Sequence, residues 1–179
     1  AHFNLGVIYQ DLDQKDKALL SYKKAIKITP NYSSAHNNLG NLYKELGEIE
    51  LAIESLEWAI AYKHDYAEAH NNLGSALNES GRITDAIASF QNALNFNPNY
   101  VRAMFNLSLA LKDIGKKEAY FELIEKTVKL KPNWSDAQLH LSRVKKYKSN
   151  DPQIAELNSF LSENELPLKD QINFSFTLA

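Results

Sequence analysis

The hexapeptide AHNNLG occupies residues 35–40 and returns unchanged at residues 69–74, and the variant AHFNLG opens the chain at residues 1–6. The glycines that close these copies are 34 residues apart (40 − 6 and 74 − 40), and two serines continue the series at the same interval: Gly6, Gly40, Gly74, Ser108 and Ser142. Copies of one motif at a fixed interval indicate a protein that is built from structural repeats.

Four further columns of residues keep the 34-residue interval. They are an aromatic column, a proline column with one histidine, and two alanine columns: Tyr32, Tyr66, Tyr100 and Trp134; Pro30, His64, Pro98 and Pro132; Ala18, Ala52 and Ala86; Ala25, Ala59 and Ala93. Because several columns agree at once, chance does not explain the period.

Each unit also carries two apolar stripes whose residues are three and four positions apart, which is the spacing of one helical face. In the second unit these stripes are Leu39, Leu42, Tyr43 and Leu46, followed by Ala52, Ile53, Leu56, Ala59 and Ile60. Gly47 and Gly81 lie between paired stripes, where a helix needs a left-handed residue after its last turn. The sequence therefore predicts an all-α fold of paired helices, each about 14 residues and roughly 20 Å long. A single pair cannot bury its own apolar face, so we expect the pairs to stack.

The motif and its period resemble the tetratricopeptide repeat, whose pattern is W-x2-L-G-x2-Y…A-x3-F…P. The second and third units read His36-x2-Leu39-Gly40-x2-Tyr43 with Ala52-x3-Leu56, and His70-x2-Leu73-Gly74-x2-Leu77 with Ala86-x3-Phe90 and Pro98. Histidine replaces the tryptophan of the family, and serine replaces the glycine in the last two copies. The resemblance covers about residues 1–148, or four and a half repeats with the first truncated. It implies an α-solenoid wound into a right-handed superhelix.

The remaining segment, residues 149–179, departs from the period and is expected to form an irregular helix pair that leads into a further, truncated repeat. Asp151 followed by Pro152 predicts a helix start. If Leu178 and Ala179 take the Leu-Gly position, the repeat before them has a three-residue insertion (178 − 141 = 37). The segment resembles bacterial proteins that join tetratricopeptide repeats to a sulfotransferase domain, on the match of Asp151-Pro152, Ile154, Leu157, Leu166-Pro167 and Phe176 to Ala179.

The composition and the absence of catalytic motifs exclude several classes of function. The chain has 179 residues, a formal net charge of −2 and no cysteine. It therefore has no global field that would draw it to nucleic acid or to an anionic membrane, and no thiolate metal site. No apolar run reaches the roughly 18 residues that span a bilayer. No nucleophile elbow, phosphate-binding glycine loop or H-E-x-x-H helix is present. We expect a non-catalytic chain without a cofactor, metal, nucleic-acid or membrane partner, and a cytoplasmic location.

Two polar columns are candidates for a site. The histidine column, His2, His36 and His70, places one imidazole in each repeat, which favours core packing over a metal site. The asparagine column is Asn4, Asn38, Asn72 and Asn106, with His140 in the fifth copy and with Asn37, Asn41 and Asn71 close by. Asparagine inside a helix costs on the order of 0.5 kcal/mol relative to alanine. We therefore expect this column to serve binding, whereas the alternative is hydrogen bonding between helices.

The asparagine column resembles that of the repeat domain of O-linked N-acetylglucosamine transferase, where a ladder of asparagines holds the main chain of substrate peptides. In the family the first helix of each pair lines the concave surface, so the resemblance implies a peptide groove over these asparagines and Arg102. The lysine/arginine clamp of co-chaperone repeats is not matched, because Phe3 and Val7 occupy its two leading positions.

Three functional hypotheses remain open at this stage. The chain is a protein–protein interaction module that binds an extended peptide in the groove. Alternatively it is the substrate-recruiting arm of a larger bacterial transferase, either a sulfotransferase or a glycosyltransferase. The third hypothesis is a scaffold that self-associates through exposed terminal repeats.

Overall fold

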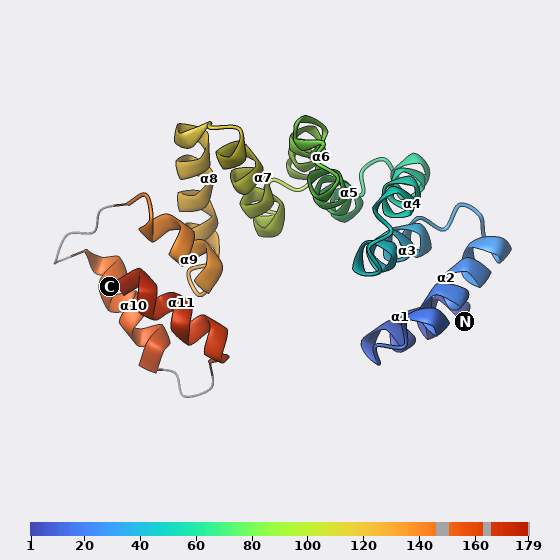
Figure 1. The fold of residues 1–179 in the computed structure, drawn as a ribbon, viewed down its shortest axis with the longest axis horizontal. Helices are drawn as coiled ribbons and strands as arrows, with labels where there is room; N and C mark the ends of the chain where they lie inside the picture. The colour runs from blue at the N-terminus through green and yellow to red at the C-terminus, as the bar shows by residue number, and fades with distance from the viewer. Residues whose placement is uncertain (146–150, 163–165, 179) are drawn as a thin grey trace. The chain divides into compact units, whose positions relative to one another are not determined.

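The computed structural model describes residues 1–145, 151–162 and 166–178, and every regular element in those ranges is an α-helix (Figure 1). Eight helices follow the 34-residue period: α1 (His2–Asp11), α2 (Lys15–Ile28), α3 (Ser33–Glu45), α4 (Ile49–Tyr62), α5 (Ala67–Glu79), α6 (Ile83–Phe96), α7 (Val101–Asp113) and α8 (Lys117–Leu130). The middle pairs consist of a 13-residue and a 14-residue helix. The predicted all-α solenoid of paired helices is confirmed.

Three more helices complete the described chain: α9 (Ser135–Ser142), α10 (Pro152–Ser162) and α11 (Leu168–Leu178). The predicted start of α10 is confirmed, because the backbone N–H of Gln153 donates to Asp151 Oδ1 at 3.0 Å. α10 begins 35 residues after α8 (152 − 117) and α11 begins 33 residues after α9 (168 − 135), so the helix starts stay close to the period. The expected boundary after residue 148 and the position expected for Ala179 lie outside the described residues.

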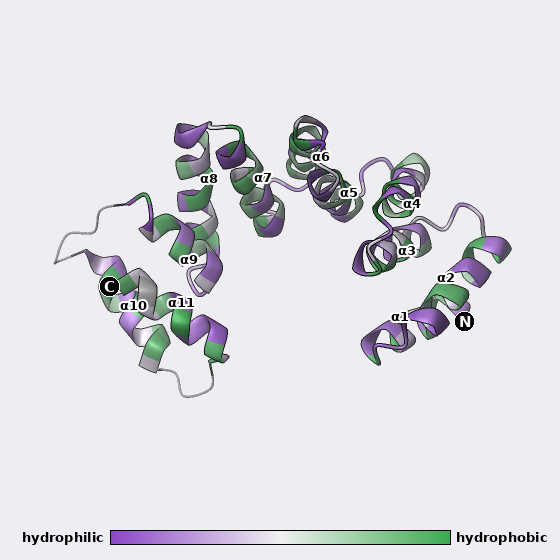
Figure 2. Cartoon of the chain, viewed as in Figure 1, coloured by the Kyte–Doolittle hydropathy of each residue, from purple (hydrophilic) through white to green (hydrophobic). Residues whose placement is uncertain are grey.

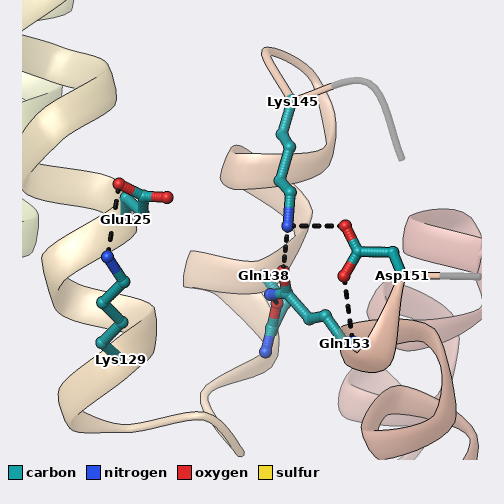
Figure 3. A network of polar contacts seen from close by, with 6 residues as sticks. All are labelled: Glu125, Lys129, Gln138, Lys145, Asp151 and Gln153. Atoms are coloured by element: carbon teal, nitrogen blue, oxygen red, sulfur yellow. Dashed lines mark hydrogen bonds and ion pairs between the residues drawn. The ribbon is translucent and has the colours of Figure 1, made fainter. Parts of the chain in front are cut away.

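A polar network connects α9 with α10 (Figure 3). The Lys145 ammonium lies 2.9 Å from Asp151 Oδ2 and donates to Gln153 Oε1 at 2.8 Å. The Gln153 amide donates to Gln138 Oε1, and the Gln138 amide donates to the carbonyl oxygen of Pro132, each at 2.7 Å. The hydrogen bonds from Lys145 and from the Gln153 backbone hold the pKa of the Asp151 carboxyl below its ordinary value. This network joins the start of α10 to Gln138 of α9 and to the turn at Pro132, which precedes α9.

Contacts divide the chain into two compact units, Ala1–Asn106 and Leu107–Ala179. In the first unit each first helix packs on its own second helix and on the second helix before it. The helices carry hydrophobic and hydrophilic residues side by side (Figure 2). The two column alanines of α4, Ala52 and Ala59, are completely buried. In the second unit α9 packs against α8 and α11, and α11 packs against α10.

The turn between paired helices needs one left-handed residue. Gly47 and Gly81 have φ angles of 79° and 81°, as predicted, and Gly115 has 78°. In the first repeat the equivalent residue is Asp13, at φ 55°. A residue with a side chain is strained in this conformation, although aspartate tolerates it better than most.

Replacing Asp13 by glycine should therefore raise the free energy of unfolding by about 0.5–1 kcal/mol. The ion pair lost with Lys15 spans 3.8 Å and its carboxylate is exposed, so it contributes little. Urea unfolding followed by circular dichroism measures the difference. Asp13→Ala is the matched control and should destabilise, so equal shifts for the two variants would contradict the role of the φ angle.

Candidate functional site

The candidate asparagines all lie on the first helices of the repeats, but they differ in exposure. Asn4 and Arg102 are exposed, Asn38, Asn41 and Asn106 are half-buried, and Asn37, Asn71 and Asn72 are buried. The exposed fractions of Asn37, Asn71 and Asn72 are 0%, 1% and 9%. The structure thus separates the predicted set into a buried group and a group that reaches the surface.

The buried group forms hydrogen bonds between successive first helices. The Asn72 amide donates to Asn37 Oδ1, and the Asn106 amide donates to Asn71 Oδ1, each at 2.9 Å. The buried amides also donate to their sequence neighbours, Asn37 to Asn38 and Asn71 to Asn72, at 3.3 Å. The bonds between helices join residues 35 positions apart, which is one repeat plus one residue. The sequence carried this signal in its two adjacent asparagine columns, but their pairing was not predicted.

A second polar row runs beside the first and was also not predicted. The Gln10 amide donates to Glu45 at 3.1 Å, and the Lys44 ammonium lies 3.6 Å from Glu79, again 35 positions on. The Tyr22 hydroxyl donates to Gln10 Oε1 at 2.9 Å. Burial raises the pKa of Tyr22, so its hydroxyl keeps the proton that it donates. Phe3 replaces the buried asparagine in the first repeat, and Asn38 donates instead to the Tyr22 oxygen at 3.4 Å.

Several amides remain open to a ligand on this face. Asn4 and Asn41 make no side-chain hydrogen bond within the described residues, and both reach the surface. Asn38 is half-buried, and both of its side-chain hydrogen bonds are long: its amide donates to the Tyr22 oxygen at 3.4 Å and its Oδ1 accepts from the Asn37 amide at 3.3 Å. Glu68 and Arg102 are exposed near the starts of α5 and α7. Near their starts the first helices therefore present neutral amide groups together with the Glu68 carboxylate and the Arg102 guanidinium.

The histidines of the second and third repeats pack in the core, as expected. His36 and His70 are buried, and their Nε2 atoms lie 2.8 Å from the carbonyl oxygens of Pro30 and His64. Their rings pack against Tyr62 and Phe96 at centroid distances of 5.4 Å. Gln138 makes the same bond to Pro132 in the fifth repeat, which marks the position as structural. Among the described side chains no three metal-ligating groups gather closely enough to hold an ion.

No described helix combines the length and apolar character that a bilayer span requires.

Comparisons with known proteins agree with this architecture. A family model described as "TPR repeat" matches residues 11–47, 40–78 and 74–115. No curated protein matches the chain. Among solved structures, the MamA protein is 30% identical over 79% of this chain and 78% of its own, with a TM-score of 0.71.

Two other structures are similar in part. A mutant O-GlcNAc transferase from Thermobaculum terrenum is 28% identical, with a TM-score of 0.68, over 72% of this chain but only 25% of its own. The first TPR domain of Spaghetti, which was solved with an HSP90 peptide bound, is 20% identical with a TM-score of 0.62. It covers 63% of this chain and 90% of its own, and at that identity it shows the fold alone.

Proposed function

The chain belongs to the tetratricopeptide-repeat family, and from that premise we propose that it binds an extended polypeptide along the first helices of its repeats. Repeats of this family are generally non-catalytic protein-interaction domains, and no catalytic family is identified in this chain. The finer statement, a peptide held over the asparagine column, is the proposal.

The observation that supports it is the open group of amides, Asn4, Asn38 and Asn41. A neutral amide offers one acceptor and two donor hydrogens, which match the C=O and N–H groups of an extended main chain. Asn37, Asn71 and Asn72 join the first helices to one another instead. The Asn37 and Asn72 amides donate to the neighbouring first helix, and Asn71 Oδ1 accepts from the Asn106 amide. Contacts to the main chain would give affinity with little selection of side chains, whereas Glu68 and Arg102 would favour residues of opposite charge.

The test begins with selection of binders to the full chain from a displayed library of random peptides. Replacing Asn4, Asn38 and Asn41 together by alanine should weaken the selected peptide at least about tenfold, since each lost hydrogen bond contributes about 0.5–1.5 kcal/mol. The melting temperature should change little, because the two hydrogen bonds that Asn38 makes are long. N-methylation of the peptide backbone should weaken binding in the same way.

A matched control replaces Asn31, Asn92 and Asn95, which are exposed and are not part of any first helix. This triple variant should bind the peptide as the parent does. If it loses as much affinity as the first triple variant, or if the first variant loses none, the asparagine face does not bind the peptide.

A second candidate function is the substrate-recruiting arm of a larger transferase. Its support is the 28% identity to the O-GlcNAc transferase structure, of which this chain spans a quarter. The resemblance of the C-terminal segment to sulfotransferase proteins stays a prediction. Sequencing the parent gene past Ala179 tests both, because a downstream domain with a sugar-nucleotide or phosphosulfate site is expected and a stop codon would reject the idea.

A further inference from the structure

The second helices of the first two repeats carry charges of opposite sign. α2 contains five lysines and one aspartate, for a formal charge of +4 (5 − 1). α4 contains three glutamates and no basic residue, for a formal charge of −3. α8, in contrast, has three lysines and three glutamates and is neutral. The segregation is therefore particular to α2 and α4.

These two helices form the walls of a groove. The groove has a volume of about 240 Å³ and is lined by Lys23 and Ile26 of α2, by His36, Leu39 and Tyr43 of α3, and by Leu51, Glu54, Ser55 and Trp58 of α4. α3 is its floor, so α2 and α4 stand on either side of it.

The groove has an exposed apolar edge. Trp58 and Leu51 are 47% and 42% exposed. At the position of Trp58 the other repeats have Lys24, Asn92 and Lys126. Trp58 stacks on Tyr62 of the same helix at a centroid distance of 5.7 Å, but the polar equivalents show that the fold does not require an indole ring there. Tryptophan is enriched among the residues that dominate the binding energy of protein interfaces.

The charged groups of the two walls do not neutralise each other. In the described parts of the chain no ion pair joins a lysine of α2 to a glutamate of α4, although all of Lys23, Lys24, Lys27, Glu50, Glu54 and Glu57 are exposed. Lys23 instead lies over the Tyr43 ring, 5.6 Å from its centroid. Both walls are thus available to pair with a partner of complementary charge.

We propose that this face, α2 and α4 with the groove between them, binds a second copy of the chain in a two-fold symmetric dimer. A two-fold axis that runs along the groove turns the face over and exchanges its sides, so α2 of each copy meets α4 of the other. Each basic wall then contacts an acidic wall, and Trp58 and Leu51 are covered. A surface that contains both signs on opposite sides of an axis is self-complementary, which is what a closed dimer requires.

The dimer is separate from the peptide site. Its groove is lined by residues of α2, α3 and α4, and none of the candidate asparagines is among them. It also differs from stacking through exposed terminal repeats, because head-to-tail stacking continues indefinitely and a two-fold contact closes at two copies.

Sedimentation equilibrium of the full chain at increasing concentration measures the association. The mass should rise from that of one chain to twice that value and stop there. Raising the salt concentration should weaken the dimer, because the charged walls are exposed and screened. A chain that stays monomeric, or one whose mass keeps growing without a plateau, overturns the proposal.

Charge reversal identifies the face. The variants K23E/K24E/K27E and E50K/E54K/E57K each give two walls of the same sign, and each should weaken its own dimer about tenfold or more. Mixed together, the two variants should form a heterodimer, because the acidic α2 meets a basic α4 and the basic α2 meets an acidic α4. Failure of the mixture to associate overturns the proposal.

Mixing proteins of opposite net charge could cause association by itself, so α8 supplies a matched control. K117E/K126E/K129E and E118K/E122K/E125K change the charge by the same amounts on another second helix. Each should dimerise like the parent, and their mixture should gain nothing further. Trp58→Lys, which copies the residue of the first and fourth repeats, should weaken the dimer and leave the melting temperature of the monomer unchanged. If the control variants lose the dimer, or if Trp58→Lys leaves it intact, the face is wrong.

Discussion

Replacing Gly74 by serine should lower the free energy of unfolding by about 2–3 kcal/mol, because the site has no room for a side chain. A Cβ atom at Gly74 would lie 2.6 Å from Cδ1 and Cε1 of the Phe90 ring. Phe90 is 2% exposed and cannot move into solvent. The first helix of the third repeat, α5, would therefore have to move away from the second helix of the same repeat, α6.

The fourth repeat shows how this position can accept a side chain. There the glycine is Ser108 and the phenylalanine is Ile124, and both residues are completely buried. Phe90→Ile alone removes buried apolar surface and should cost about 1–2 kcal/mol. The double variant Gly74→Ser with Phe90→Ile should lose less than the sum of the single losses, by at least about 1 kcal/mol.

Urea unfolding of the four proteins in this cycle measures the coupling. Losses that add without coupling would mean that the close approach of Gly74 to Phe90 does not limit stability. A loss below about 0.5 kcal/mol for Gly74→Ser alone would contradict the overpacking argument directly.

The fold was predictable because its determinants are local and repeated. Gly40 and Gly74 mark the close approach of paired helices, Gly47 and Gly81 mark the turns, and both kinds of position recur every 34 residues. A residue that varies between repeats is harder to interpret. Asp13 takes the left-handed conformation of the glycines, and no pattern within a single repeat indicates that it does.

The candidate site was predictable only in part. The column Asn4, Asn38, Asn72 and Asn106 was found from its register, but register does not tell which amides are bonded inside the protein. The bond from Asn72 to Asn37 depends on the distance between neighbouring first helices, which is a property of packing. The charge difference between α2 and α4 was missed for a similar reason, because mixed charges along the chain look balanced until the helices are placed side by side.

Replacing Asn71 by alanine should lower the free energy of unfolding by about 2 kcal/mol, although alanine is the better helix former. Asn71 accepts from the Asn106 amide at 2.9 Å and donates to Asn72 Oδ1 at 3.3 Å, and it is 1% exposed. Truncation leaves two partners without their bond and creates a small cavity, which together cost about 2–3 kcal/mol. The gain in helix propensity returns on the order of 0.5 kcal/mol.

The contrast with Asn41 separates the two groups of asparagines. Asn41 occupies the middle of α3 but makes no side-chain hydrogen bond within the described residues. Asn41→Ala should therefore be neutral or stabilise by up to about 0.5 kcal/mol through helix propensity. Thermal and urea unfolding of the two single variants compares them directly.

A cycle with Asn106→Ala tests whether the loss at Asn71 comes from the bond between the helices. The two variants should couple by more than about 0.5 kcal/mol, because each removes the same hydrogen bond. Equal effects of Asn41→Ala and Asn71→Ala, or additive losses at Asn71 and Asn106, would show that the amides do not join the repeats. The coupling, if found, means that substitutions for testing peptide binding belong at Asn4, Asn38 and Asn41, where they change the surface and leave the stack of helices intact.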